Sequence, residues 1–488
     1  MTDLYTSCAT APVRSPVWGR SAVQAAVAGL TALLLSGCAG LAATTTDVQP
    51  TAQVPAAWPT ANAASAPVTA SASLPVWSDY FADPALRQLI DIAIAQNRDL
   101  RVSLLNIEQA RAQLGSRRAD QLPTVNVSVS GSRSPSTNGT INSSYSGGLL
   151  VSSYELDFWG RVSSLSDQAL AQYLATQEGA RTAQISLIST VAQSWLNLLA
   201  DEELLALSQQ TLVSRVDGLR LNKLRFDNGA ASELELRQAE SLTEAARVTL
   251  AQQQRQRAQD ENALVLLLGQ PLPAALRSQL TQARLTQLRL PELPLALPSE
   301  VLAQRPDIRQ AEQQLAAANA NIGAARAAFF PSITLTAGVG SASGALDNLF
   351  KSGFWGYTLA PQLLLPIFDA GRNQAGLDSA KAGREIALAQ YDKAIQSAFR
   401  EVADALAGRD TLGEQLRAQT AQADAEVLRQ RLTELRYKNG AASLLDSLDA
   451  QRSLFSAQQA VVQARLAYWN NQITLYKTLG GGAPTATH

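Results

Sequence analysis

Prolines are absent from two long windows of this chain, residues 136–270 and 367–483, although the sequence contains 20 of them. Both windows are rich in Ala, Leu, Gln, Glu and Arg, which are strong helix formers, whereas proline breaks helices. No cluster of turn residues interrupts 161–226 or 372–437. Each of these segments would be roughly 100 Å long as a helix. Helices of that length do not fit a compact domain, so we expect them to pack along neighbours as coiled coils.

Four short segments lack this helical character. "LPTVNVSVSGS" starts at Leu122 and "FPSITLTAGVGS" at Phe330, and both alternate apolar with small polar residues, as two-faced strands do. A second candidate strand follows each one, "SYSGGLLVSSYEL" from Ser144 and "FWGYTLAPQLLL" from Phe354. The sequence therefore predicts β-hairpins at about 122–157 and 331–367. Aromatic residues near the strand ends would suit a membrane-interface girdle: Tyr145, Tyr154, Trp355 and Tyr357. A pair of soluble hairpins is the alternative.

The order helix, hairpin, long helix, turn, helix occurs twice, which indicates an internal duplication. The two turns read "DNGAAS" and "KNGAAS", and "Gly-Arg" follows each second strand. We predict a first repeat at 76–270, a proline-rich linker at 271–298, a second repeat at 299–480 and a tail at 481–488. Two hairpins give four strands, which are too few for a closed barrel in one chain. A membrane-spanning sheet would therefore require several chains.

The N-terminus predicts export and lipidation. Basic residues precede an apolar run that is too short to span a bilayer and ends in "LLSGC" at Cys38. This ending resembles a bacterial lipobox, which implies a signal peptide at 1–37, a covalent lipid such as palmitate on Cys38, and an acylated tether at 38–75. Ala39 after the cysteine, by resemblance to lipoprotein sorting rules, points to the outer membrane of a Gram-negative bacterium. An ordinary signal peptide with a chance cysteine is the alternative.

The composition restricts the possible chemistry. The net charge is −1 and the only histidine is His488. The charge argues against a nucleic-acid binder, and a single histidine at the last residue argues against histidine catalysis and histidine-based metal sites. We therefore expect no enzyme activity, no catalytic residues, no metal, and no cofactor besides the lipid on Cys38.

Several stretches resemble a known family, the TolC-like outer membrane factors of tripartite efflux systems, in the lipoprotein branch called NodT-type. The matching pieces are "LPSEVLAQRPDIRQAEQQLAAANANIGAARAAFFPSITL" (297–335), "SYELDFWGR" (153–161), "LPIFDAGR" (365–372) and "RYKNGAASLLDSLDAQRSLF" (436–455). The resemblance implies an α+β membrane protein that forms a homotrimer. Its twelve-stranded transmembrane β-barrel, four strands per chain, would continue into a long periplasmic α-helical barrel, with an equatorial region built from the linker.

The resemblance also implies partners. The two helix turns would face the hairpin tips of a periplasmic adaptor (membrane fusion) protein, and the turn residues that would make this contact are Asn228, Gly229, Ala230, Asn439, Gly440 and Ala441. The lipobox and the "RPDI" stretch favour an inner-membrane pump of the resistance-nodulation-division type. Turns with no docking role are the alternative.

A periplasmic gate is implied by the same resemblance. Leu445 and Asp449 would point into the lumen on one helix face, with Asp446 as a neighbouring candidate and Tyr437 and Arg452 as tethers between helices. In a trimer a leucine ring blocks by dewetting and an aspartate ring favours cations. The alternative is that these charges form a solvated helix face.

The leading functional hypothesis is a passive outer membrane exit duct for drugs or other toxic solutes, energised by the pump and opened by the adaptor. Two alternatives stay open: a non-pore structural coiled-coil lipoprotein of the periplasm, and a type I protein secretion duct. The sequence does not identify the transported substrate.

Overall fold

The computed structural model describes residues 74–137, 139–280, 283–291, 293 and 299–481. The predicted signal peptide, Cys38 and almost all of the predicted tether therefore lie outside the described residues. The described chain forms two compact units, a sheet unit made of Pro123–Ser164 with Gly323–Gln374, and a helical unit made of the remainder.

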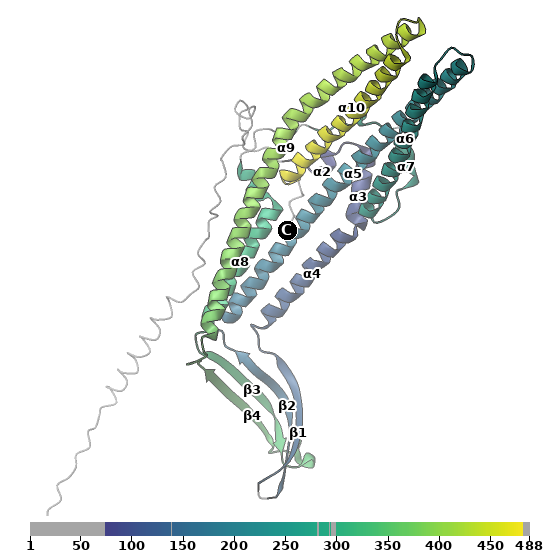
Figure 1. The fold of residues 1–488 in the computed structure, drawn as a ribbon. Coiled ribbons are helices and arrows are strands. Elements are labelled where there is room, and N and C mark those ends of the chain that lie inside the picture. Colours follow the sequence, from purple (N-terminus) through teal and green to yellow (C-terminus); the bar gives the residue numbers. More distant parts are fainter. Residues whose placement is uncertain (1–73, 138, 281–282, 292, 294–298, 482–488) are drawn as a thin grey trace, which may run out of the picture. The chain divides into compact units, whose positions relative to one another are not determined.

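The sheet unit contains four antiparallel strands in the order β1-β2-β3-β4 (Figure 1). Their bounds are β1 Val125–Pro135, β2 Ile141–Glu155, β3 Ser332–Ser343 and β4 Trp355–Leu364, with a short 3-10 helix η5, Leu346–Asn348, between β3 and β4. Each predicted hairpin contains two of these strands. The hairpins come from different repeats and are joined by the β2–β3 pairing.

The register gives this sheet two different faces. Val127 lies opposite Leu149, which lies opposite Val339, which lies opposite Tyr357. The adjacent row across the sheet reads Ser128, Gly148, Gly340 and Gly356. The predicted alternation is thus confirmed. The apolar row is open to the surroundings, with Val127 78% and Tyr357 85% exposed.

Glycines allow the two repeats to approach closely where β2 meets β3. Gly148 pairs directly with Gly340. A Cβ atom added to Gly148 would lie 2.4 Å from the Val339 carbonyl oxygen and 2.5 Å from the Gly340 Cα atom, which is closer than real Cβ contacts allow. The pairing between the repeats therefore requires a residue without a side chain at this position.

Four long helices dominate the remainder of the described chain, namely α5 Arg161–Asp227, α6 Glu233–Leu268, α9 Arg372–Lys438 and α10 Leu444–Thr478. The helix predicted over 161–226 and the one predicted over 372–437 each end one residue later in the structure. α5 pairs with α6 and α9 pairs with α10, so each pair forms a helical hairpin (Figure 1).

Shorter elements precede or connect these hairpins: α2 Trp77–Tyr80, α3 Pro84–Gln96, α4 Arg98–Ala119, α7 Ala274–Leu280, η3 Leu285–Gln287, η4 Ser299–Gln304 and α8 Pro306–Ala327. α3 starts as its sequence suggests. Asp83 accepts a hydrogen bond from the Ala85 N–H at 2.8 Å, and Pro84 occupies the first helical position. None of the helices among the described residues is long and apolar enough to cross a membrane.

The core of the helical unit joins the first and last described elements. Tyr80 of α2 stacks on Tyr476 of α10 with ring centroids 4.1 Å apart. The Tyr80 hydroxyl donates to the Gln472 carbonyl at 3.1 Å, and the Tyr476 hydroxyl donates to the Pro75 carbonyl at 3.0 Å. Phe81 and Trp195 are fully buried in the same cluster.

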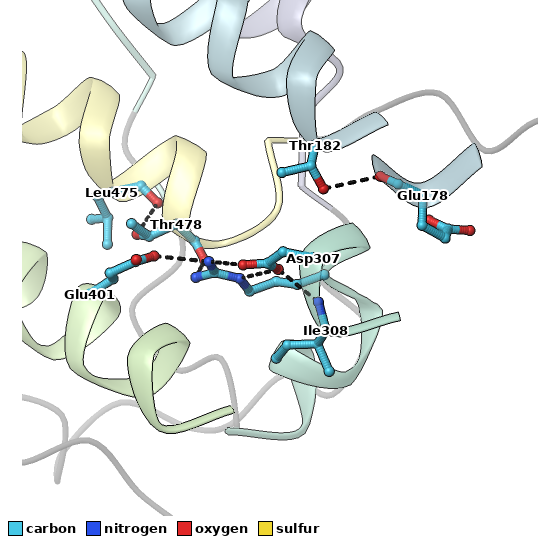
Figure 2. A network of polar contacts seen from close by, with 8 residues as sticks. Glu178, Thr182, Asp307, Ile308, Glu401, Leu475 and Thr478 are labelled. Carbon is cyan, nitrogen blue, oxygen red and sulfur yellow. Dashed lines mark hydrogen bonds and ion pairs between the residues drawn. The ribbon is translucent and has the colours of Figure 1, made fainter. Parts of the chain in front are cut away.

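In each repeat, the residue just before the helix that leads to the first strand, α4 or α8, holds the last turn of that repeat. Asn97, before α4, donates to the Leu267 carbonyl at the end of α6 at 2.9 Å. Arg305, before α8, donates to the Thr478 carbonyl at the end of α10 at 2.7 Å. Arg305 also binds Asp307 and Glu401 of α9 at 2.6 and 2.8 Å (Figure 2). Both repeats therefore use a side-chain hydrogen bond to hold the end of their last helix. The donor is the neutral amide of Asn97 in the first repeat and the charged guanidinium of Arg305 in the second.

Candidate functional site

The turn between α5 and α6 is built entirely from local hydrogen bonds. Gly229 has φ 72°, a left-handed conformation that glycine adopts easily. Its N–H donates to the Phe226 carbonyl at 2.9 Å, and the Ala230 N–H donates to the Arg225 carbonyl at 2.7 Å. This pattern is a Schellman motif, which satisfies the last carbonyls of a helix.

The turn between α9 and α10 repeats this geometry. Gly440 has φ 73°. Its N–H donates to the Tyr437 carbonyl at 3.0 Å, and the Ala441 N–H donates to the Arg436 carbonyl at 2.8 Å. All six turn residues predicted to dock an adaptor are exposed: Asn228, Gly229, Ala230, Asn439, Gly440 and Ala441.

Serines start the helix that follows each turn. Ser232 accepts from the Glu235 N–H while Glu235 accepts from the Ser232 N–H at 2.7 Å. Ser443 and Asp446 form the same capping box, with the Ser443 N–H donating to Asp446 at 2.9 Å. The Ser443 hydroxyl, and then its N–H, lower the pKa of Asp446. Asp446, a predicted gate candidate, is therefore a helix-capping carboxylate within its own chain.

An acid–base cluster lies farther along α10. Asp449 faces two cations, Arg452 of the same helix and Arg429 of α9, each with a guanidinium nitrogen 3.6 Å from a carboxylate oxygen. All three side chains are exposed to a large extent, and so is Leu445 one turn earlier. The structure thus brings the predicted Leu445, Asp449 and Arg452 together and adds Arg429 to them.

Two side-chain contacts join the two helical hairpins, one of them close to the turns. Arg225 of α5 donates through Nη1 to the Tyr437 hydroxyl of α9, and its guanidinium carbon lies 5.6 Å from the Tyr437 ring centroid. Farther from the turns, the buried Arg215 of α5 donates to the Gln451 amide oxygen of α10. Burial, and then the charge of Arg452, lower the pKa of Arg215. Tyr437 therefore contacts the first hairpin of its own chain.

Comparing the two repeats position by position shows which of these site residues they have in common. Counting from the two cap serines, Leu445 corresponds to Leu234, which is also exposed, and Asp446 corresponds to Glu235. By the same count the remaining positions differ between the copies, as these pairs show: Tyr437 with Phe226, Asp449 with Gln238, Arg452 with Ser241 and Arg429 with Gly218. The tyrosine hydroxyl that binds Arg225 and the residues of the acid–base cluster thus have no equivalents at the matching first-copy positions.

Sequence reasoning missed Arg225, Arg429 and the Arg215–Gln451 contact. Arg225 carried a signal, since it is the first-copy counterpart of Arg436. The counterparts act differently, however, because Arg436 donates to the Ala441 carbonyl of its own turn at 3.2 Å.

Comparison with known proteins identifies the family. The family model described as outer membrane efflux protein matches residues 89–270 and 297–481, one segment in each repeat. The chain belongs to the outer membrane efflux protein family. It is 45% identical over 463 residues to the toluene efflux pump outer membrane protein TtgC of Pseudomonas putida, covering 93% of this chain and 94% of the relative. It is 41% identical to the outer membrane protein OprJ of Pseudomonas aeruginosa, covering 96% and 97%.

A solved structure supports the same conclusion for this outer membrane efflux protein. The open state of the Neisseria gonorrhoeae MtrE outer membrane channel is similar with a TM-score of 0.80 and 42% identity, covering 89% of this chain and 97% of that one. The predicted TolC-like fold, with four strands and long paired helices, is confirmed, as are the outer membrane location and the role in efflux. The relatives are named as channels and pump components, which supports transport rather than catalysis.

Proposed function

We propose that three copies of this chain form the exit duct of a tripartite efflux pump. The observation that carries the proposal is the two-faced sheet, in which an exposed apolar row lies beside a row of serine and glycine. Such a sheet can present one face to lipid and the other to a water-filled lumen. The duct is passive, so energy comes from the inner-membrane pump.

The edges of the sheet support assembly of several copies, and the number three is what the TolC-like resemblance implies. Among the described residues, β1 and β4 each have one unpaired edge, and unpaired backbone groups are not tolerated in hydrocarbon. Pairing β4 of one copy with β1 of the next removes every edge. Three copies give twelve strands, the number that the TolC-like resemblance implies.

The partners proposed here are an adaptor and a pump. The exposed Asn-Gly-Ala turns are small and flat, which suits contact with the helical tips of a periplasmic adaptor. Relatives named for toluene and antibiotic efflux support drugs or other toxic solutes as cargo. The lipobox and the "RPDI" stretch favour an inner-membrane pump of the resistance-nodulation-division type. The lipid on Cys38 would anchor each copy to the same membrane.

The gate is proposed at the second-copy cluster. In a ring of three chains, Leu445 would form an apolar constriction and Asp449 an acidic ring, with Asp446 beside them at the start of α10. Arg429 and Arg452 each lie 3.6 Å from Asp449 and reduce the repulsion between the carboxylates. Tyr437, bound to Arg225, would hold the second hairpin against the first while the gate is closed.

Planar-bilayer recording of the purified protein tests the duct. We expect trimers in detergent that dissociate on heating, and a stable ion conductance after reconstitution. A monomeric protein that gives no conductance would instead support the structural lipoprotein. That alternative and the type I protein secretion duct are not favoured by the efflux names of the relatives.

The gate is tested separately by the double variant Asp449→Ala, Arg452→Ala. Loss of the ring charge and of its partner should raise the conductance and sensitise cells to large antibiotics. The matched control is Gln238→Ala, Ser241→Ala, at the corresponding first-copy positions. Equal conductance and equal antibiotic uptake in the parent, the double variant and the control would exclude this gate.

A further inference from the structure

The loop between β3 and β4, residues 344–354, folds back over one face of the sheet. A Cβ atom built on Gly147 of β2 would lie 3.9 Å from the Leu349 Cδ2 atom and 3.9 Å from the Val129 Cγ2 atom. Val129 is the residue paired with Gly147 and follows Val127 on the apolar face. Leu349 therefore rests on the apolar face and not on the serine-rich one.

Burial and register agree with this placement. Leu349 is only 3% exposed. Ser341 and Ser343 of β3 are also buried, and the register puts both on the face that carries Val339. The Ser343 hydroxyl accepts a hydrogen bond from the Ala345 N–H at 3.2 Å, which fixes the start of the loop. Leu349 thus attaches the loop to the sheet.

Two further apolar side chains of the loop, those of Leu346 and Phe350, are mostly exposed in the described structure. Phe350 is 75% exposed and Leu346 is exposed beside it, while Trp355 and Tyr357 continue the apolar face into β4. The loop's charges offset each other, since Lys351 lies 4.0 Å from Asp347 and also donates to Asn348 at 2.5 Å. Offsetting charges lower the cost of placing the loop at a membrane boundary.

The position of the loop decides between lipid and a second copy as its partner. Leu349 covers β2, an interior strand, whereas copies of the chain can pair only along the edges of β1 and β4. The apolar face is continuous from Val127 to Tyr357 and is the face that the proposed barrel presents to hydrocarbon. The loop also lies at the end of the sheet opposite the strand ends that lead into the helices, which is the outer-leaflet end in that barrel.

We propose that the β3–β4 loop is a lipid anchor, in which Phe350 and Leu346 insert among the acyl chains of the outer leaflet. The inference rests on the proposed barrel and extends it beyond the strands. It gives each copy a fixed apolar contact at the outer surface, in addition to the strand face.

Lipid-directed fluorescence quenching tests the anchor. Phe350→Cys, Tyr357→Cys and Thr137→Cys proteins would be labelled with an environment-sensitive dye and reconstituted in phosphatidylcholine vesicles, with or without nitroxides on the acyl chains. The parent chain, labelled in parallel, gives the background. We expect blue-shifted emission and strong quenching at 350, as at the strand position 357, and water-like emission without quenching at 137, in the exposed β1–β2 turn.

Two results would overturn the anchor. Water-like emission at 350 would place the loop in solvent, and blue-shifted emission that acyl-chain nitroxides do not quench would place it against another protein chain. Conductance of the same vesicles separates the lipid anchor from the proposed exit duct. Vesicles that conduct ions but carry an unquenched label at position 350 contradict the anchor and leave the duct standing. Phe350→Asp should also lower the yield of membrane-inserted trimers relative to Phe350→Leu, and equal yields would count against it.

Discussion

At the scale of single residues, Tyr437 carries the contact that joins the two hairpins at their turns. Its hydroxyl is the acceptor for Arg225, and its first-copy counterpart Phe226 has no such group. A hydrogen bond with one charged partner contributes on the order of 1.5–3 kcal/mol. That energy is large enough to favour the closed state of the proposed gate and small enough for the proposed adaptor to overcome.

We predict that Tyr437→Phe raises the open fraction of the pore. The ring stays in place while the hydroxyl is lost, so the fold should persist and the average conductance in planar bilayers should rise. Phe226→Leu, at the matched position of the other turn, should leave conductance unchanged. A Tyr437→Phe protein indistinguishable from the parent would remove Tyr437 from the gate.

Asp201 is a second residue whose replacement should have a measurable effect, in this case on how stability depends on pH. It lies on α5, is only 6% exposed, and its Oδ2 atom has no hydrogen-bond donor in the described part of the chain. Burial, followed by a hydrogen bond with the carboxyl group of Asp260, raises the pKa of Asp201 to about 8. The native protein therefore retains a proton that the unfolded chain releases at a much lower pH.

This difference predicts how stability changes with pH. Between about pH 4 and pH 8 the native state binds more protons at this site than the unfolded state, so its contribution to stability falls as pH rises through that window. Asp201→Asn removes the titrating group. The variant should melt at a higher temperature than the parent at pH 8.5 and show a flatter dependence of melting temperature on pH. If the melting temperatures of the parent and of Asp201→Asn change with pH in the same way, the raised pKa of Asp201 is contradicted.

The sequence identified only part of the candidate gate. Asp449 and Arg452 are three residues apart on one helix, so their contact could be predicted from spacing. Arg429 and Arg225 reach their partners from other helices, and such contacts depend on helix rotation and packing, which spacing along the chain does not determine.

At the scale of elements, the hydrogen bonds of Asn97 and Arg305 each fix the base of one helical hairpin. Figure 2 shows Asp307, Glu401 and Thr478 converging on one side chain, which is the buried Arg305. Because Arg305 binds α9 and the end of α10 together, this base is held more firmly than the turn ends, where the Arg225–Tyr437 contact joins the two hairpins.

Arg305→Ala should lower the free energy of unfolding by roughly 3 kcal/mol, because it removes several charged hydrogen bonds at once. Asn97→Ala should cost about 1–2 kcal/mol, since it removes a helix cap and one neutral hydrogen bond. Arg305→Lys should fall between the parent and Arg305→Ala, because one ammonium group cannot reach all three partners in the same geometry. Chemical denaturation of the purified protein measures all three, and a larger loss at Asn97 than at Arg305 would contradict this ranking.

Element lengths were predictable where proline was absent and helix formers were dense, which is why α5 and α9 each end within one residue of the prediction. The short elements between the repeats, such as α7 and η3, were not predicted. Brief helical turns in a proline-rich segment are set by burial of single leucines, among them Leu276 and Leu285, and sequence periodicity cannot resolve such short pieces.

At the scale of the whole molecule, the β2–β3 pairing makes one sheet from two repeats. Each hairpin could be predicted from its own alternation. The pairing between hairpins could not, because β2 and β3 are separated by two long helices and no local pattern sets their register. The Gly148–Gly340 contact that specifies it became visible only in the structure.

Gly148→Val should therefore prevent assembly. The new Cβ would meet the Val339 carbonyl and the Gly340 backbone, a clash that costs roughly 4 kcal/mol or more if the strands stay paired. We expect few heat-dissociable trimers in membrane extracts. Gly356→Ala, on the same row but with open space where the new Cβ atom would lie, should assemble normally. Normal trimer yields from Gly148→Val would show that the pairing tolerates a side chain.

The unpaired edges of β1 and β4 also constrain the order of events during biogenesis. In a ring closed only by β4-to-β1 joints, one copy or two copies always leave two strand edges open. Such partial rings cannot rest in hydrocarbon, because their edges carry unsatisfied backbone groups. Insertion should therefore be all-or-none, with the copies meeting before or during entry into the bilayer. Membrane-embedded dimers should not accumulate even when one copy is in short supply.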